Sequence, residues 1–550
     1  MDRHPGSAPN SLWKRVLDGE GALSLETVGL PVFLPKQRWF GEKSHHIRST
    51  RILDWAALKS SNSALALVEV RLEDELVDLF LVSLGMTFGD SQENLQRSAP
   101  NAIVSTIVSG AVGGILNDAI YDDKACGALL SLIANSGQLR AHTGRIRGVR
   151  GEAFQDLLGA AELPLPVKRG SAEQSNTSIL YGDRFILKLF RRLEAGPNPD
   201  CEICRFLSEK TTFDRVPPFA GLIEYQPDGD APSVTLAMLQ GLVANEGDGW
   251  KWTLEELDHY FQACAPLVFP KRLRGGLGKP MDLSEHPAFQ LARHHVGTYL
   301  DAAAMLGRRT GELHLALSVP TDDAALLAEP LTREDIHEIL DDLRSTSAAA
   351  LSALRKRLSE LPDDTFEMAL SVLSQRRWIL EYFDMLKTRT PRAKKIRIHG
   401  DYHLGQVLVV KNDFVILDFE GEPARPLSYR RSKQCPLKDV AGMLRSFSYA
   451  AYTSLFDYTA RHPEDAERMA PWAQLWERAV ATEFLRAYRE TTHRADFLPS
   501  DGVVFRKLLD IFLLDKAFYE VAYELNSRPA WLRIPLMGIM SLLDRIVTRH

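Results

Sequence analysis

Two acids and an amide stand in a fixed order around residue 400 of this 550-residue chain. Asp401 comes first, Gln406 follows five residues later, and Asp418 ends an apolar run twelve residues further on. Phosphoryl-transfer sites use such an order: one carboxylate orients the acceptor hydroxyl, while an amide oxygen and a second carboxylate hold Mg²⁺ beside the nucleotide phosphates. We therefore predict that Asp401 is the catalytic base and that Gln406 and Asp418 bind Mg²⁺, with ATP as the phosphate donor.

Other polar residues of the same segment are candidates for supporting contacts. Glu420 lies two residues after Asp418 and is a candidate for a further contact to metal or substrate. His399 and His403 flank Asp401 with a spacing of four residues, which some metal sites use. No third ligand of that kind is evident, so we expect these histidines to fix the loop by hydrogen bonds, with His403 also a candidate substrate contact.

Lys188 is the candidate for binding the phosphates of the nucleotide. It alternates with apolar residues on the predicted strand Phe185–Phe190 and precedes Asp401 in the chain. An ammonium group there can pair with the α- and β-phosphates. Glu202, on the next predicted helix, is its candidate ion-pair partner, and Asp200 is predicted to cap the start of that helix.

Candidate contacts to the adenosine part of ATP follow the last predicted strand of the β-rich region. Gln240 and Leu242 lie where a hinge is expected and would face adenine, and Asp248 would bind ribose unless it belongs to a surface turn. No G-x-G-x-x-G motif precedes Lys188. The small polar segment 170–178 stands there instead, which favours a small-molecule kinase over a protein kinase.

The predicted elements that must position these residues form a β-rich first half and a helical second half. Alternation of apolar and polar residues predicts a hairpin over residues 64–82, and two β-like runs that flank Gly182 and Asp183 predict another over residues 178–190. Residues 1–25 are expected to be loosely ordered. Amphipathic periodicity predicts helices over Asp122–Asn135, Leu254–Ala263, Ala288–Leu306, Arg333–Leu361, Thr365–Lys387, Val440–Ala460, Ala470–Glu490 and Phe505–Leu525.

This order of elements predicts an α+β fold with the two-lobed layout of kinases. The strand–loop–strand of residues 396–419 would be embedded in the helical lobe. We predict an N-terminal cap and intermediate region over residues 1–150, a β-rich lobe over 151–245 and a mainly helical lobe over 246–550.

Composition narrows the functional class. The net charge of −6 disfavours a dedicated nucleic-acid binder. Five cysteines, an odd number, are typical of a reducing compartment rather than a disulfide framework. The first residues lack the apolar core of a signal peptide, and no run is apolar enough for a membrane span. We expect a cytoplasmic protein with no membrane segment.

Several longer segments match the sequence pattern of one enzyme family. They are Leu34–Gly41, Ala244–Trp250, Leu306–His314, His399–Gln406, Asp418–Pro423 and Pro436–Ser446. In these segments, which are spread over nearly the whole chain, the sequence resembles the bacterial maltokinases, which make maltose 1-phosphate from maltose and ATP. Aminoglycoside phosphotransferases share only the shorter pieces around Asp401 and Asp418.

The resemblance implies an aminoglycoside phosphotransferase-like fold behind the cap and the roles given above to the metal- and phosphate-binding residues. It also implies a disaccharide site that includes Tyr519 and Tyr523, which share a helical face, although both could instead be core residues. Maltokinases are often fused to trehalose synthase, so the resemblance implies a role in glycogen or α-glucan synthesis and a trehalose synthase as a partner.

Two residues depart from the family pattern. Tyr429 and Cys435 stand where more polar residues are expected, which leaves the acceptor sugar open. Glucosamine kinase is the nearest alternative. A catalytically silent partner of trehalose synthase is another, but the full set of Lys188, Asp401 and metal ligands disfavours it.

Overall fold

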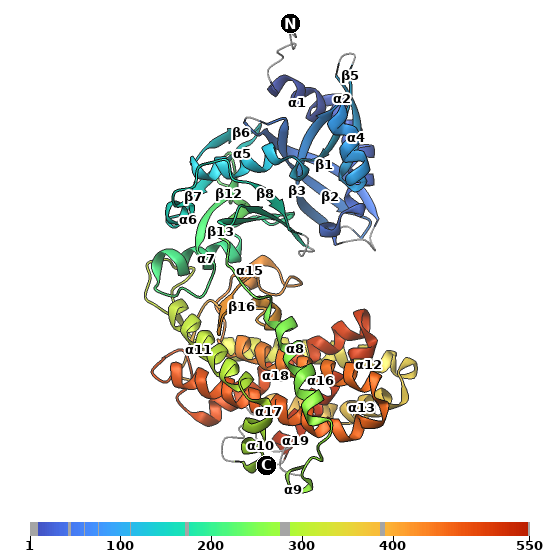
Figure 1. The fold of residues 1–550 in the computed structure, drawn as a ribbon, viewed down its shortest axis with the longest axis vertical. Helices are drawn as coiled ribbons and strands as arrows, with labels where there is room; N and C mark the ends of the chain where they lie inside the picture. Colours follow the sequence, from blue (N-terminus) through green and yellow to red (C-terminus); the bar gives the residue numbers. More distant parts are fainter. Residues whose placement is uncertain are drawn as a thin grey trace. The chain divides into compact units, whose positions relative to one another are not determined.

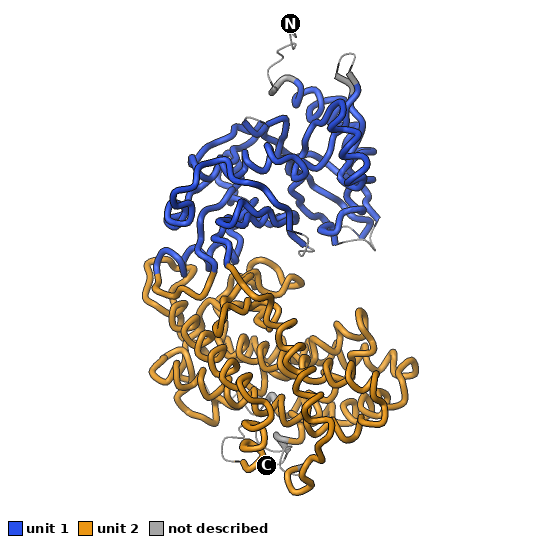
Figure 2. Tube along the Cα trace, viewed as in Figure 1, with its two compact units in different colours: residues 1–210, 217–243 blue, residues 211–216, 244–550 orange. Residues whose placement is uncertain are grey.

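The computed structural model describes residues 9–41, 46–59, 61–74, 76–109, 112–170, 175–274, 286–384 and 391–547 of the chain. These residues form two compact units, shown in different colours in Figure 2. Unit 1 comprises residues 1–210 and 217–243, and unit 2 comprises residues 211–216 and 244–550. Part of the predicted phosphate-binding segment 170–178, residues 171–174, lies outside the described residues.

Unit 1 is built on two antiparallel sheets (Figure 1). In the first, strands β1 (Ile47–Ala57), β2 (Ser63–Leu72), β3 (Val77–Phe88), β5 (Val112–Asp118) and β4 (Ile103–Ser109) follow in this order, and β11 (Arg192–Leu193) pairs with β3. The second has the order β6 (Gln138–Arg140), β7 (Gly144–Arg150), β12 (Phe219–Pro227), β13 (Val234–Gly241), β10 (Phe185–Phe190), β9 (Asn176–Tyr181) and β8 (Val167–Arg169). The helices of this unit are α1 (Pro9–Leu17), α2 (Gly19–Ser24), α3 (Leu30–Phe33), α4 (Asp90–Ser98), α5 (Asp123–Ala134), α6 (Phe154–Leu158) and α7 (Pro199–Lys210).

The first sheet confirms one prediction and corrects another. Strands β2 and β3 pair antiparallel along most of their length, which confirms the 64–82 hairpin. The expectation that residues 1–25 are loosely ordered is wrong for the described part, because α1 and α2 form there. Trp13 and Leu17 are 2% and 3% exposed and join the core of this sheet, so burial of two apolar side chains orders the segment.

The second sheet holds Lys188 in a central strand. Strand β10 pairs with β9 on one side and β13 on the other, which confirms the 178–190 hairpin. Gly182 has a φ of 57° and supplies the left-handed residue in the turn between β9 and β10. Lys188 is 9% exposed, opposite Ser178 and Met238. A ladder on both sides therefore fixes the backbone of this lysine.

A buried arginine links the two sheets of unit 1. Arg191 directly follows β10 and is fully buried. Its Nη2 donates to Asp118 at 2.7 Å and its Nε to Thr177 Oγ1 at 2.8 Å. Its guanidinium carbon lies 4.8 Å from the centre of the Trp39 ring. Since Asp118 ends β5 and Thr177 lies on β9, one side chain connects strands of both sheets.

Unit 2 is mainly helical (Figure 1). Gly307 lets α11 approach α17, because a Cβ there would come within 2.2 Å of the Phe484 carbonyl oxygen. The helices are α8 (Gly249–Cys264), α9 (Lys271–Arg274), α10 (Pro287–Val296), α11 (Tyr299–Leu317), α12 (Arg333–Lys356), α13 (Asp363–Ser374), α14 (Arg376–Asp384), α15 (Leu427–Arg430), α16 (Leu437–Arg461), α17 (Ala466–Thr491), α18 (Gly502–Ser527) and α19 (Arg533–Val547). Two small hairpins pair β14 (Glu329–Pro330) with β15 (Lys394–Lys395), and β16 (Val407–Val410) with β17 (Asp413–Ile416).

Two predicted helices are each divided in the structure. The segment Ala288–Leu306 is split between α10 and α11 at Gly297, whose φ of 61° ends the first helix. The segment Thr365–Lys387 is split between α13 and α14 at Gln375. Among the residues that the structure describes, no helix has both the length and the apolar character that a membrane span needs.

Helix α16 anchors the loop that carries Asp401 through a buried carboxylate. Asp439 is 1% exposed, and its two oxygens accept the backbone N–H groups of His399 at 2.7 Å and Gly400 at 2.8 Å. His314 Nε2 on α11 lies 3.2 Å from the same carboxylate. Burial opposes ionisation of Asp439, but the hydrogen bond and charge of His314 outweigh it and hold its pKa below the ordinary value.

The same face of α16 also contacts the loop at Gly442 and Ser446, one and two turns after Asp439. A Cβ on Gly442 would lie 2.6 Å from the Tyr402 carbonyl oxygen, so only glycine allows the loop to approach the helix this closely. Ser446 Oγ accepts the backbone N–H of Leu404 at 3.0 Å. Positions three, four and seven residues apart share a helix face, so α16 presents these contacts as one surface.

Replacing Asp439 should destabilise unit 2 strongly. Asp439→Ala leaves two buried backbone N–H groups without their carboxylate, and we expect the free energy of unfolding to fall by about 3–5 kcal/mol. Urea denaturation followed by tryptophan fluorescence measures this change. Asp457→Ala, an exposed acid on the same helix, is the control and should stay within about 0.5 kcal/mol of wild type. A variant at position 439 as stable as the control would contradict the anchoring role.

The stabilisation by Asp439 should also depend on pH. Because its pKa in the folded protein lies below the ordinary value, its contribution is complete above about pH 4 and is lost as the pH falls through the folded pKa. We expect the stability difference between wild type and Asp439→Asn to be constant from neutral pH down to about pH 4 and to shrink below it. Urea midpoints at a series of pH values test this, and a difference that grows in acid would refute it.

Candidate active site

Asp401 is held as an ionised carboxylate on a turn. Gly400, directly before it, has a φ of 84°, a left-handed conformation that glycine tolerates. Asp401 Oδ1 accepts a hydrogen bond from Lys516 Nζ on α18 at 3.2 Å. Burial opposes ionisation of Asp401, but the charge of Lys516 outweighs it and holds the pKa of Asp401 below its ordinary value. At neutral pH the carboxylate can therefore accept a hydrogen bond from a hydroxyl group.

The two histidines of the segment fix the loop, as expected from the sequence. His399 is 1% exposed, and its Nε2 lies 2.7 Å from the Leu417 carbonyl oxygen, which ties the loop to the end of the β16–β17 hairpin. His403 Nδ1 accepts the backbone N–H of Gly405 at 3.0 Å and caps the 3₁₀ turn η7 (Leu404–Gln406). Its Nε2 lies 3.9 Å from Asp401 Oδ2. Its candidate role as a substrate contact stays a prediction.

The predicted metal ligands of unit 2 lie together. Gln406 Nε2 donates to Asp418 Oδ2 at 3.0 Å, so the two side chains are neighbours although twelve residues separate them. Asp418 has a φ of 66°, a left-handed conformation that costs free energy in a residue other than glycine and is found most often at functional sites. One carboxylate oxygen of Asp418 and one of Glu420 lie within 4.8 Å of each other.

This donor set fits Mg²⁺ chemically. The amide nitrogen of Gln406 donates to Asp418, and this contact does not involve its amide oxygen. An amide oxygen and two carboxylates are hard oxygen donors of the kind Mg²⁺ prefers, and they offer no nitrogen or sulfur ligand that would select a softer metal. Gln406, Asp418 and Glu420 are therefore suited to a magnesium site, and this role stays a prediction.

The structure gives Lys188 an ion pair within unit 1. Lys188 Nζ lies 3.2 Å from Asp200 Oδ2, and both side chains are buried. The prediction that Asp200 caps α7 is wrong, because Asn198 Oδ1 accepts the backbone N–H groups of Asp200 and Cys201 and leaves Asp200 in the first turn. Glu202 lies on the same helix, and its pairing with Lys188 stays a prediction.

The residues predicted to face adenosine have structural partners. Gln240 Nε2 lies 3.4 Å from the buried Cys204 sulfur. The N–H of Leu242 donates to the Arg184 carbonyl at 2.8 Å, so this residue can offer adenine a carbonyl but not its N–H. Asp248 caps α8 by accepting the backbone N–H of Lys251 at 2.8 Å. Contacts of these three residues to a nucleotide stay predictions.

A polar cavity lies beside Asp401 in unit 2. Its lining includes Asp401, Glu422 and residues of α18. Glu422 is shared by several cations: Lys516 Nζ lies 2.9 Å from its carboxylate, Arg425 Nε 3.7 Å and Lys438 Nζ 3.9 Å. Burial opposes ionisation of Glu422, but Lys516 and Lys438 outweigh it and hold its pKa below the ordinary value. Two carboxylates and three cations therefore lie close together at the predicted base.

The two tyrosines of α18 have different surroundings. Tyr519 lines the cavity, and Lys516 Nζ lies 4.8 Å from the centre of its ring. An aromatic face beside a polar cavity is suited to stacking on a sugar ring. Tyr523 is 47% exposed and packs its ring against the guanidinium of Arg528, with 5.4 Å to the ring centre. Tyr519 thus lies next to Asp401, whereas Tyr523 lies one turn further along the helix.

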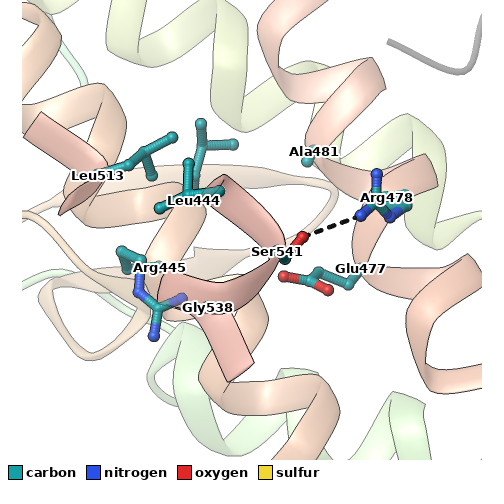
Figure 3. Close-up of a pocket in the computed structure, with 9 residues that line it drawn as sticks. Leu444, Arg445, Glu477, Arg478, Ala481, Leu513, Gly538 and Ser541 are labelled. Carbon is teal, nitrogen blue, oxygen red and sulfur yellow. Dashed lines mark hydrogen bonds between the residues drawn. The ribbon is translucent and has the colours of Figure 1, made fainter. Parts of the chain in front are cut away.

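A second cavity of unit 2 lies among helices α16, α17, α18 and α19 (Figure 3). Arg445 lines it from α16 and pairs with Glu520 on α18, with Nη2 2.7 Å from Oε2. Arg478 on α17 donates to Ser541 Oγ on α19 at 3.1 Å. A Cβ on Gly538 would come within 2.2 Å of the Arg445 guanidinium, so the glycine lets α19 pass over the arginine. We assign these groups to helix packing rather than to the candidate site.

Sequence reasoning missed several residues that shape the candidate site. Lys516 and Asp515 lie more than a hundred positions after Asp401 and within a helix whose pattern signals only amphipathicity. Glu422, Lys438 and Asp439 lie within segments that match the maltokinase pattern, which is the only signal that could have found them.

Comparison with known proteins adds a second source of information. Residues 33–122 match the family model of the maltokinase N-terminal cap domain. Over 401 residues the chain is 25% identical to a glucosamine kinase of Streptacidiphilus jiangxiensis, which covers 71% of this chain and 76% of that protein. A glucosamine kinase of Mycolicibacterium smegmatis is 24% identical over 377 residues, or 68% of this chain and 79% of that protein.

A solved structure extends the likeness to most of the chain. A glucosamine kinase in complex with glucosamine, ADP and inorganic phosphate aligns with a TM-score of 0.59 at 21% sequence identity, over 90% of this chain and 94% of that one. Likeness at this level of identity shows the fold. The chain therefore has the fold of glucosamine kinase, which confirms the predicted α+β kinase-like fold with an N-terminal cap domain.

Proposed function

We propose that this chain is an ATP-dependent sugar kinase that requires Mg²⁺ and phosphorylates maltose at its anomeric hydroxyl to give maltose 1-phosphate. The observation that carries the proposal is the Asp401 carboxylate, held ionised by Lys516 beside a polar cavity. The neighbouring pair of Gln406 and Asp418 supports phosphoryl transfer. The match of residues 33–122 to a maltokinase cap domain supports maltose as the acceptor.

In the proposed reaction the protein mainly positions and orients its substrates. Asp401 accepts a hydrogen bond from the acceptor hydroxyl through Oδ2, because Lys516 occupies Oδ1. The acceptor oxygen forms a bond to the γ-phosphorus of ATP while the bond from that phosphorus to the β,γ-bridging oxygen breaks, and ADP leaves. Asp401 takes the hydroxyl proton as the new ester forms.

The nucleotide-binding roles are part of the same proposal. Gln406 and Asp418, with Glu420 beside them, would hold Mg²⁺, which neutralises charge on the phosphates when bound. Lys188, steadied by its ion pair with Asp200, would bind the α- and β-phosphates. Its buried position on a central strand limits the conformations of its long side chain, which favours a fixed phosphate contact.

The proposed product, maltose 1-phosphate, suggests which reactions would precede and follow this one. Maltose 1-phosphate is an activated sugar that a glycosyl-transferring enzyme could use to extend glycogen or another α-glucan. A trehalose synthase, which would supply maltose, is the partner that the resemblance to maltokinases suggests.

Glucosamine kinase is the second candidate function. The relatives and the solved structure that align with most of this chain carry that name. Tyr429 bears on the choice, because its hydroxyl lies 3.2 Å from Lys438, a residue of the cavity lining. An altered side chain there could change the acceptor, so the acceptor needs direct measurement.

Replacing the base should remove activity while leaving the fold intact. Asp401→Asn keeps the shape of the side chain but loses the negative charge that accepts the proton, so we expect kcat to fall by about 10²–10⁴-fold. A coupled assay of ADP release with saturating maltose measures kcat. Asp457→Asn on α16 is the control and should match wild type. Equal rates for Asp401→Asn and wild type would remove the assigned role.

The identity of the acceptor follows from its product. We expect wild type to convert maltose and ATP into a compound that carries phosphate on the anomeric carbon, because Asp401 has to face that hydroxyl. Incubation with maltose, glucose or glucosamine, followed by mass spectrometry and phosphorus NMR, gives both the acceptor and the position. Much faster turnover of glucosamine than of maltose would favour the second candidate.

A further inference from the structure

A residue with an unpartnered carboxylate oxygen belongs to the lining of the cavity beside Asp401. Asp515 precedes Lys516 on α18 and lines the same cavity. Its Oδ1 is buried and has no hydrogen-bond partner among the residues that the structure describes. Burial also raises the pKa of Asp515 above its ordinary value. A buried carboxylate oxygen without a donor is costly, so a residue that carries one in the lining of a cavity is a candidate for a hydrogen bond from a ligand.

The position of Asp515 suits contact with the molecule that Asp401 would activate. Lys516, its neighbour in the chain, reaches both Asp401 at 3.2 Å and Glu422 at 2.9 Å. Asp401, Glu422 and Asp515 thus line one small cavity from two segments of the chain. A polyhydroxyl molecule has several donors at short spacing and can reach two carboxylates at once.

Three cations balance these three carboxylates. Lys516, Lys438 and Arg425 all lie within 4.0 Å of Glu422. Tyr429 helps to hold two of them, since Lys438 Nζ lies 4.9 Å and the Arg425 guanidinium 4.8 Å from the centre of its ring. The cavity is therefore close to neutral before anything binds.

Charge balance distinguishes two classes of acceptor. An ammonium group would bring a fourth positive charge into a cavity whose lining already holds three cations beside its three carboxylates. An uncharged hydroxyl can donate to Asp515 without disturbing the balance. The cavity is thus electrostatically suited to a neutral sugar rather than to an aminosugar.

We propose that Asp515 is an acceptor-binding residue whose Oδ1 accepts a hydrogen bond from a sugar hydroxyl, and that the balanced charges around it select an uncharged sugar over an aminosugar. This inference rests on the proposed sugar kinase function and adds a residue that binds the acceptor and a physical reason for an uncharged acceptor. Asp515 has no part in proton transfer, so its effect should fall on acceptor binding.

The kinetic test compares substitutions of Asp515 with wild type on maltose. Asp515→Ala removes the carboxylate that would accept a hydrogen bond from the sugar. We therefore expect KM for maltose to rise about 10–100-fold, with KM for ATP unchanged. Asp515→Asn keeps an oxygen acceptor and should recover part of the loss. It also keeps the test valid if the alanine variant folds poorly. Asp510→Asn, another buried acid of α18, is the matched control and should leave KM for maltose at the wild-type value.

A second variant tests whether the charges of the cavity select an uncharged sugar. Lys438→Gln removes one of the three cations, so it should raise kcat/KM for glucosamine relative to maltose by about tenfold. Wild type should prefer maltose or glucose to glucosamine under the same conditions. A wild-type preference for glucosamine, or no change of preference in Lys438→Gln, would overturn the selection by charge.

The outcomes separate this inference from the proposed function. If wild type phosphorylates no sugar, both are wrong. If it phosphorylates maltose but Asp515→Ala has the wild-type KM for maltose, the sugar kinase stands and the role of Asp515 is wrong. A rise in KM for maltose that Asp515→Asn partly reverses supports both.

Discussion

The candidate site depends on one face of helix α16. Asp439 accepts two backbone N–H groups of the loop that carries Asp401, Gly442 lets the loop lie against the helix, and Ser446 accepts the backbone N–H of Leu404. These contacts fix the backbone of the loop, and none of them involves the side chain of Asp401, which contacts Lys516 instead. A base positioned by its backbone keeps its carboxylate for the substrate, which is what a catalytic group requires. The buried ionised Asp439 is tolerated because His314 and the loop compensate its charge.

A second helix sets the electrostatics of the same loop. Lys516 on α18 contacts Asp401 and Glu422, so the ionisation of the predicted base depends on a residue 115 positions away in the chain. The same lysine lies against the ring of Tyr519, where a sugar could stack. One helix therefore combines the group that tunes the base with those that would recognise the acceptor. We therefore expect substitutions in α18 to affect both the ionisation of Asp401 and the binding of the proposed acceptor.

The sequence predicted the parts of the site that are local in the chain. Asp401, Gln406 and Asp418 stand close in sequence, and the turn between two short strands brings the last two into contact. Strand β10 with Lys188 was also predicted locally, from the β-like runs that flank Gly182 and Asp183. Asp515, Lys516 and the anchoring role of Asp439 could not be found in this way, because nothing in a helical pattern says which loop its polar residues will meet. The same limit explains the ordered N-terminus, where burial of Trp13 and not propensity decides.

The most direct measurement is a structure of the chain with maltose and a non-hydrolysable ATP analogue in the presence of Mg²⁺. We expect the anomeric hydroxyl to lie within hydrogen-bond distance of Asp401 Oδ2, another sugar hydroxyl to lie within that distance of Asp515 Oδ1, and the metal to bind Gln406 and Asp418. Maltose bound away from Asp401, or the cavity beside Asp401 filled by a group other than the sugar, would contradict it.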